Sequence, residues 1–381
     1  MDFALNEELT LVRDMARSFA EAELLPRATR HDRQGTLDRE VFEKLRELGL
    51  WGLTIPEEYG GAGLGNLALA VVLEEVNRAC ASTGVTLSVH NSLIGAPLRK
   101  FGSEAQRREW LPRLSSGEVI GAYCLTEPNA GSDAGALRTS ARIDGDDFVV
   151  NGTKVWVTNG GWAGLFLVYV RTEPGTSRAK GISALLVPGD SPGIQVGKPE
   201  KKCGIRGSST TEVEFSNVRV PRSNLLGSLN DGFRIAMDTL DGGRIGIASQ
   251  AVGIGRACLE AAIKYSKERE QFGRPIGEFQ AIQWKLADMA TRLDAARLLV
   301  MKAAWMRDRG ERSSQAAAEA KLFASQTANF CADESLQIHG GAGYTDHFHV
   351  ERLFRDARIT EIYEGASDIQ RIVIARAITA R

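Results

Sequence analysis

The spacing of hydrophobic residues changes twice along the chain, and these changes constrain the fold more than any other feature. In roughly the first 120 residues, apolar side chains recur every three or four positions, which is typical of helices that bury one face. The first such series is Leu5, Leu9, Val12, Met15 and Phe19. Further helices are predicted at 39–48, 66–80, 90–101 and 104–115, and the glycine-rich stretch 52–65 is predicted as a loop.

From about residue 120 to 230 the pattern predicts strands. Four runs rich in β-branched and aromatic residues occupy 148–159, 165–172, 181–188 and 210–221. Asn151-Gly152 is a favourable two-residue turn, so we predict a hairpin there. Short strands at this spacing indicate an antiparallel barrel or sandwich of roughly a hundred residues.

Helical spacing returns after about residue 230. One series steps by four and three residues alternately, as in an antiparallel bundle: Ile282, Leu286, Met289, Leu293, Ala296, Val300 and Ala303. An alanine-rich segment at 315–338 predicts another bundle helix. This order predicts an α+β fold of three domains: an N-terminal helical domain (1–120), a middle antiparallel β-domain (121–228) and a C-terminal helical bundle (229–381).

Charge and cysteine usage narrow the class of protein. The 47 basic and 48 acidic side chains are well mixed, which argues against nucleic acid as a partner. The five cysteines are odd in number and widely separated, as in a reducing compartment. The first residues do not resemble a targeting peptide, and the longest apolar run, near 165–170, is too short for a bilayer. We therefore expect a cytoplasmic protein with no integral membrane segment.

Several common site motifs are missing from the sequence. Neither a dinucleotide-binding GxGxxG after a strand nor a phosphate-binding GxxxxGK[ST] occurs, and there is no HExxH. His347 and His349 have no matching cluster of ligands, so we expect no metal site.

Four other segments carry unusual combinations of residues. YCLTEPNAGSDAGA (123–136) could bring backbone N–H groups close to a ligand, although a turn-rich linker has the same composition. VWVTNG (155–160) places Trp156 and Thr158 on one strand face, where a tryptophan is more often part of the core. REQFGRPIGEFQ (269–280) offers arginines suited to a diphosphate, but it also reads as a plain connection between helices.

The fourth segment has two parts near the C-terminus. QIHGGAGY (337–344) has glycines that permit close backbone approach, and ITEIYEGASDIQR (359–371) contains Glu364 at a bend before Gly365. Taken alone, such a glutamate is usually a solvated surface charge.

In order and spacing, all four segments resemble the signature regions of the acyl-CoA dehydrogenases over essentially the whole chain. The similarity is greatest to the short-chain, butyryl-type branch, especially at TLDGGRIGIASQ (239–250) and ARITEIYEGASDIQR (357–371). The resemblance implies an N-terminal helical domain, a middle β-domain and a C-terminal four-helix bundle. It also implies FAD as cofactor, a homotetramer, electron-transfer flavoprotein as electron acceptor and a place in fatty-acid β-oxidation.

The resemblance assigns roles to individual residues. Those implied to bind FAD are Tyr123, Leu125, Thr126, Gly131, Ser132, Trp156, Thr158, Arg269, Gln271, Phe272, Phe279, Gln280, Gln337, Gly340, Gly341, Ala366, Ser367 and Asp368. Those from Arg269 to Gln280 are implied to reach the FAD of a neighbouring subunit, and 337–341 the adenosine-diphosphate half. Those implied to bind the acyl-CoA substrate are Ser132, Asp241, Arg244, Gln250, Tyr363, Gly365 and Arg376.

Glu364 is implied to be the catalytic base that removes the α-proton of the thioester. Its backbone N–H and a ribityl hydroxyl of FAD would stabilise the enolate-like charge, and an apolar pocket would raise its pKa. The product would be the trans-2-enoyl-CoA.

Departures from the family pattern refine the substrate. Some members carry the base just before the arginine that matches Arg244; here that residue is Gly243, which favours Glu364. Gly84 replaces the arginine of glutaryl-CoA dehydrogenases, which argues against a dicarboxylic substrate. Gln250 matches a residue that shortens the acyl pocket, so butyryl-like chains are expected, with branched or cyclic acyl groups as alternatives. Ala366 replaces a common threonine and Asn129 a common glycine.

Two other functions remain open. An acyl-CoA oxidase would use the same half-reaction, but such chains are typically much longer. A non-catalytic CoA-binding protein on this scaffold would not need Glu364 together with every flavin segment.

Overall fold

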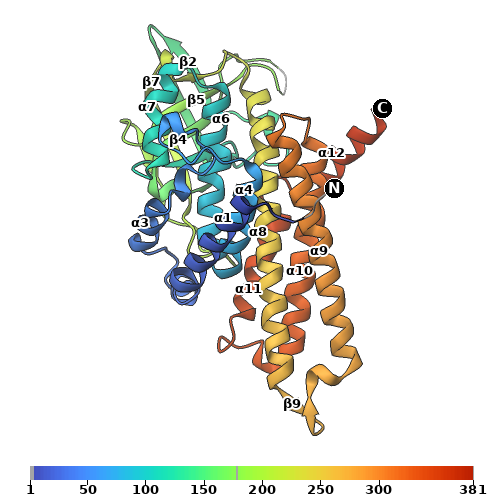
Figure 1. Ribbon diagram of the computed structural model, residues 1–381. Coiled ribbons are helices and arrows are strands. Elements are labelled where there is room, and N and C mark those ends of the chain that lie inside the picture. The colour runs from blue at the N-terminus through green and yellow to red at the C-terminus, as the bar shows by residue number, and fades with distance from the viewer. Residues whose placement is uncertain (1–3, 177–178, 381) are drawn as a thin grey trace.

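A computed structural model of the chain describes residues 4–176 and 179–380. Figure 1 shows N-terminal helices beside a sheet, and a bundle of long helices that extends away from both. The predicted order of helices, strands and helices is therefore present.

The N-terminal helices follow the predicted hydrophobic spacing. They are α1 (Glu7–Phe19), α2 (Ala28–Gln34), α3 (Arg39–Glu47), α4 (Asn66–Ala79), α5 (Ala81–Ser88), α6 (Ala96–Phe101) and α7 (Glu104–Ser115). Asn6 caps α1 through its side chain, and Ser103 with Gln106 forms a capping box on α7. A π-helical turn, η4 (Val89–Gly95), joins α5 to α6, so the predicted helix at 90–101 is a π-turn followed by an α-helix.

The middle of the chain forms one eight-stranded sheet. Its strands are β1 (Ile120–Cys124), β2 (Ser140–Asp144), β3 (Asp147–Thr158), β4 (Ala163–Arg171), β5 (Ile182–Pro188), β6 (Ile194–Val196), β7 (Thr210–Pro221) and β8 (Leu225–Leu226). The order is β6-β7-β3-β2-β4-β5-β8, with β1 paired to β4. Most pairs are antiparallel as predicted, but β1 runs parallel to β4, and β2 meets β4 in a parallel bridge.

The predicted hairpin at Asn151-Gly152 is wrong. β3 continues through both residues, and the turn between β2 and β3 lies at residues 145–146 instead. Gly152 sits at an irregularity in the β3–β7 ladder with φ 145°, where a Cβ would lie 2.5 Å from the Thr139 hydroxyl. Glycine is needed at position 152 because of this close approach. The turn expected at Asn151-Gly152 does not form, because β3 pairs with β2 on one side and β7 on the other.

The C-terminal part is a helical bundle. It consists of α8 (Gly232–Glu268), α9 (Gln280–Asp308), α10 (Ser314–His339), α11 (Val350–Arg358) and α12 (Ser367–Thr379), with a 3₁₀ turn, η10 (Ile359–Glu361), before α12. Five members of the predicted seam are buried: Met289, Leu293, Ala296, Val300 and Ala303. The connection at 269–280 is a small two-stranded hairpin, β9 (Glu270–Gln271) and β10 (Arg274–Pro275), at the far tip of the bundle (Figure 1).

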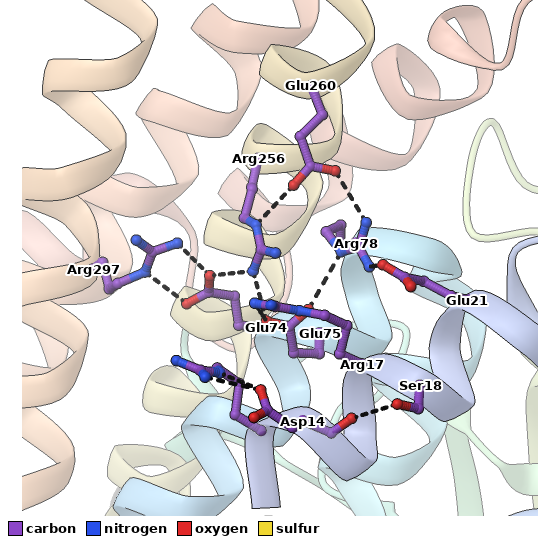
Figure 2. Close-up of polar contacts among 11 residues, drawn as sticks. Asp14, Arg17, Ser18, Glu21, Glu74, Glu75, Arg78, Arg256, Glu260 and Arg297 are labelled. Carbon is purple, nitrogen blue, oxygen red and sulfur yellow. Dashed lines mark hydrogen bonds and ion pairs between the residues drawn. The ribbon is translucent and has the colours of Figure 1, made fainter. Parts of the chain in front are cut away.

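Buried ion pairs join the N-terminal helices to the bundle (Figure 2). Glu75 of α4 accepts from Arg17 of α1 at 2.9 Å and from Arg256 of α8 at 2.7 Å. Its neighbour Glu74 forms ion pairs with Arg256 of α8 and Arg297 of α9. Burial raises the pKa of Glu75, but the two arginines outweigh it and hold the pKa below its usual value. The Glu75 carboxylate therefore stays charged, and the ion pairs of Glu74 and Glu75 tie α1, α4, α8 and α9 together.

Within the described ranges, no helix combines the length and apolar character needed to cross a bilayer. The same residues contain no group of three or more side chains that could hold a metal ion.

Candidate active site

Glu364 lies in a sharp turn between η10 and α12. Both Glu364 (φ 50°) and Gly365 (φ 93°) adopt left-handed backbone conformations. For a glutamate this conformation is unfavourable, and it persists only where the surroundings hold it. The Gly365 carbonyl oxygen accepts hydrogen bonds from Lys321 Nζ at 2.8 Å and from Gln370 Nε2 at 2.7 Å.

This turn points the glutamate side chain into the protein, against α8. A Cβ built on Gly243 would lie only 2.1 Å from Glu364 Oε2 and 2.8 Å from a methyl of Leu93. Leu93 belongs to the π-helical turn η4, a type of irregularity frequent at functional sites. Glycine at 243 thus makes room for the carboxylate, whose two oxygens are buried without a hydrogen-bond partner among the described residues.

Burial raises the pKa of Glu364 to about 7, while the positive charges of Lys321 and Arg244 act in the opposite direction. A carboxyl group that titrates near neutral pH can accept a proton and release it again. The perturbed pKa, the strained turn and the buried unpaired oxygens make Glu364 the candidate catalytic group of this region.

A chain of hydrogen-bonded side chains lies next to Glu364. The Tyr363 hydroxyl donates to Gln250 Oε1, and Gln250 Nε2 donates to the Ala81 carbonyl at 3.1 Å. Burial raises the pKa of Tyr363 far above its usual value, so the hydroxyl stays neutral. Gln250 is fully buried, and both ends of its amide are used to hold it in place.

The other expected substrate residues differ in accessibility. Arg244 is only 5% exposed and donates a 2.6 Å hydrogen bond to Asp241 Oδ1. Ser314 donates to the second oxygen of Asp241, so that carboxylate is committed within the protein. Arg376 is exposed near the end of α12, about 14 Å along the helix from its start.

A buried ion pair shapes the loop that follows β1. Lys154 Nζ on β3 contacts Glu127 Oε1 at 2.8 Å and the Leu125 carbonyl at 3.0 Å. The Glu127 carboxylate also accepts from the backbone N–H groups of Arg138 and Thr139. These bonds hold residues 125–139 as a fixed loop. Leu125 in it is buried, Thr126 is half-buried, and Gly131 and Ser132 are exposed.

Trp156 lies beside this loop on β3. Its backbone has φ 59°, and its side chain is 62% exposed. Val157 is buried between Trp156 and the half-buried Thr158, as expected if those two share the outer face. The Val155 N–H donates to the Thr126 carbonyl at 2.9 Å, which places the loop next to the tryptophan.

A second group of expected FAD residues lies at the opposite end of the bundle. In this group Arg269, Gln271, Phe272, Gln280, Gln337, Gly340 and Gly341 are exposed. Phe272 is 93% exposed, and its ring meets Phe279 edge-on at 6.0 Å. At the same end Tyr265 stacks on His339 at 4.3 Å. Tyr265 follows Gly243 by 22 residues in α8, or about 33 Å along the helix. One chain therefore does not bring this group to Glu364.

The region around Trp156 suits a flat, partly polar cofactor such as FAD. A Cβ on Gly131 would meet nothing within 4 Å, so the backbone there is open to a ligand. Ala366, Ser367 and Asp368 form the N-terminal end of α12 directly after the Glu364 turn, where N–H groups favour an anion or a polar ligand. The open backbone, the helix N-terminus and the exposed tryptophan fit the flavin segments of the expected family.

Comparison with known proteins identifies the family. Its N-terminal, middle and C-terminal domain models match residues 6–118, 122–218 and 230–379. The chain belongs to the acyl-CoA dehydrogenase family. It is 49% identical over 371 residues to the mouse mitochondrial short-chain specific acyl-CoA dehydrogenase, which covers 97% of this chain and 90% of the relative.

Solved structures agree with this assignment. The butyryl-CoA dehydrogenase of Megasphaera elsdenii matches with a TM-score of 0.97 and 42% identity, covering 100% of both chains. A structure described as the electron transferring flavoprotein of Acidaminococcus fermentans matches with a TM-score of 0.98 and 45% identity, again over 100% of both chains. The predicted family and α+β fold are confirmed, and the acyl-CoA dehydrogenase is an FAD-dependent oxidoreductase acting on CH–CH bonds.

Three residues of this acyl-CoA dehydrogenase site were not singled out in the sequence. Lys321 and Lys154 are fully buried, and the residues next to them in the sequence do not predict this burial. One signal for Lys321 was its position in the alanine-rich helix, four residues after Ala317 and three before Ala324, both of which are buried. Leu93 carries no comparable signal, because its place beside the base depends on the π-helical turn.

Proposed function

We propose that this enzyme dehydrogenates short-chain acyl-CoA thioesters to trans-2-enoyl-CoA, with Glu364 as the base. The observation that carries the proposal is the buried, unpaired carboxylate beside Gly243, whose pKa is raised to about 7. Such a carboxylate is poised to remove a weakly acidic α-proton, because no competing hydrogen bond stabilises its charge.

The chain's own groups account for the proton half of the reaction. When bound, FAD supplies the two-electron acceptor for the β-hydride. Glu364 takes the α-proton, and its backbone N–H, which has no acceptor among the described residues, is available to the thioester oxygen. Leu93 and the neighbouring apolar side chains exclude water, which keeps the base strong in this pocket.

Short acyl chains are proposed from the fixed position of Gln250 and from the relatives. Gln250 is fixed by Tyr363 and by the Ala81 carbonyl, so it cannot swing aside for a long chain. The similar proteins include short-chain specific enzymes and a butyryl-CoA dehydrogenase. A Cβ at Gly84 would lie 2.0 Å from the Asn77 side chain, so a larger residue for a dicarboxylic substrate does not fit there. Branched or cyclic acyl groups are the alternative.

Asp241 and Arg244 are proposed to lie near the part of CoA that enters the pocket. Both side chains are largely buried, at 13% and 6% exposure, so they cannot serve the nucleotide end in solvent. Ser132 and Arg376 are exposed and remain proposed contacts for the outer part of the substrate.

We also propose a homotetramer in which subunits share FAD sites. The second group of FAD residues lies near Tyr265, about 33 Å along α8 from Gly243 and Glu364, and the hairpin there carries the exposed Phe272. A neighbouring subunit would supply the hairpin and 337–341 to complete each site. Replacing Phe272 with serine should lower FAD content and the mass measured by light scattering; unchanged values for both would refute the sharing.

Electron-transfer flavoprotein is the proposed acceptor, and fatty-acid β-oxidation in the cytoplasm the proposed setting. The structural match with the Acidaminococcus fermentans structure supports the acceptor. Four buried free thiols suit a reducing compartment: Cys80, Cys124, Cys258 and Cys331. Rapid oxygen consumption with butyryl-CoA alone would favour an oxidase instead.

The decisive experiment is anaerobic bleaching of the bound flavin by a panel of CoA thioesters. Butyryl-CoA or hexanoyl-CoA should bleach fastest, and Glu364→Gln should retain FAD while losing bleaching. Undiminished bleaching in that variant would remove Glu364 as the base, and fastest bleaching by a branched thioester would replace the short straight-chain assignment.

A further inference from the structure

Lys321 lies on the buried, alanine-rich face of α10, close to the turn that carries Glu364. Its side chain is 0% exposed, and its ammonium donates a 2.8 Å hydrogen bond to the Gly365 carbonyl. Gln370 of α12 donates to the same oxygen at 2.7 Å. A carbonyl oxygen has two lone pairs, so these donors from two helices use its full capacity and fix its direction.

The Gly365 carbonyl belongs to a segment of strained backbone. Glu364 and Gly365 are both left-handed, and a Cβ on Gly365 would lie 2.5 Å from Gln370 Nε2. A glutamate keeps such a conformation only when neighbouring groups hold it. Lys321 is the charged member of the pair of side chains that do so.

We propose that Lys321 is a positioning residue for the base: its buried ammonium holds the Gly365 carbonyl, which fixes the turn that carries Glu364, and its positive charge favours the charged form of the Glu364 carboxylate beside Gly243. This inference rests on the proposed role of Glu364. Lys321 does not itself touch the reacting carbon.

The charge of Lys321 adds a second effect to its hydrogen bond. Burial lowers the pKa of Lys321 to about 8, against the opposing pull of Glu364. Burial raises the pKa of Glu364 to about 7, and Lys321 is the strongest of the groups that lower it. The other titratable and charged groups facing this pair are Arg244 and Asp241 of α8, Glu361 of η10, Tyr123 of β1 and Tyr363 of the turn.

If Lys321 served only to join α10 to α12, its charge would not affect the pH dependence of catalysis. Gln370 already satisfies the Gly365 carbonyl from α12, and any uncharged donor at 321 would complete the same link. Only a lysine that acts on the base makes the pH dependence of catalysis depend on its charge. The charge is therefore what the experiment must remove.

The test compares Lys321→Met, which removes donor and charge, with Lys321→Gln, which keeps a donor without charge. Lys321→Arg restores the charge, and Lys302→Met on the exposed face of α9 is the matched control. Flavin bleaching by butyryl-CoA is measured in the FAD-loaded enzyme from pH 5.5 to 9.5, together with kcat, KM and FAD content.

Loss of the charge should raise the midpoint of the pH profile by about one unit in both neutral variants, because the cation no longer favours the carboxylate. At pH 7 this lowers kcat about fivefold, with a further loss in the methionine variant and little change in KM. Lys321→Arg should return the midpoint towards that of the unmodified enzyme, and Lys302→Met should match it throughout.

Either of two results would overturn the proposal: neutral variants with an unshifted midpoint, or neutral variants that both fail to fold with FAD. The second would show that Lys321 serves the fold and not the base. Measuring Glu364→Gln in parallel distinguishes failure of the role proposed for Lys321 from failure of the role proposed for Glu364. Normal bleaching in Glu364→Gln would reject the base itself, whereas an inactive Glu364→Gln beside an unshifted Lys321→Gln rejects only the role of the lysine.

Discussion

Because Gly243 lies in close contact with Glu364, the proposed base, Gly243→Ala is a sensitive perturbation. The new methyl would start 2.1 Å from Glu364 Oε2, whereas ordinary contacts begin at 3.4 Å, so the carboxylate must retreat by more than 1 Å. A misplacement of this size costs about 100-fold in rate, or about 3 kcal/mol in the barrier. Alanine also gains about 1 kcal/mol in helix propensity over glycine, which offsets part of the crowding. We therefore expect a folded enzyme that reacts slowly.

The assay is the rate of anaerobic flavin bleaching by butyryl-CoA, with FAD content and thermal unfolding measured on the same samples. Gly242→Ala is the matched control, since the three atoms nearest to its Cβ would all belong to the flexible Arg307 side chain, at 3.3 to 3.5 Å. It gains the same helix propensity and should bleach within about twofold of the unmodified enzyme. If Gly243→Ala keeps its FAD and bleaches within about threefold of that control, the reasoning about the carboxylate's position is wrong.

Three further predictions concern titration and buried polar groups. Burial raises the pKa of Glu364 from 4.5 to about 7, so the native state binds the carboxyl proton more tightly than the unfolded state does. The contribution of this proton to the free energy of unfolding is present below pH 4.5 and is lost as the pH rises through 7. Glu364→Gln should therefore be more stable than the unmodified enzyme by about 3 kcal/mol at pH 8 and by less than about 1 kcal/mol at pH 5, in urea denaturation; equal differences at both pH values would contradict this. Lys154→Met leaves Glu127 buried without its partner and should cost about 3 kcal/mol of stability together with FAD retention, whereas full retention would show that the pair does not hold the loop. Tyr363→Phe leaves Gln250 Oε1 without its donor and should cost about 1 to 2 kcal/mol and relax the preference for short acyl chains; an unchanged thioester profile would mean that Gln250 does not need the tyrosine.

Much of the fold was accessible from local sequence patterns. The helices at 39–48, 66–80 and 104–115 and the strand at 210–221 follow directly from hydrophobic spacing, which depends on neighbours within a few residues. The hairpin at Asn151-Gly152 failed for the opposite reason. Pairing with β2 and β7, up to 66 residues away in sequence, decided the conformation of that dipeptide.

For the candidate site too, some features could be predicted from local sequence and others depend on packing between distant segments. Motif order alone assigned the family, and it singled out Glu364 from the other acidic side chains because Gly243 occupies the competing position. The sequence could not show that these two residues adjoin, since they are 121 positions apart and meet only when α8 packs beside the turn before α12.

Only the tertiary structure decided how readily Glu364, the proposed base, takes up a proton. Spacing determines which residues share a face, but a carboxylate's pKa depends on the water and charge around it. Here burial removes the water, while Lys321 and Arg244 arrive from two other helices. What the sequence by itself determined is therefore the family and which glutamate to propose as the base; only the packed chain raises the pKa of that carboxyl group to about 7.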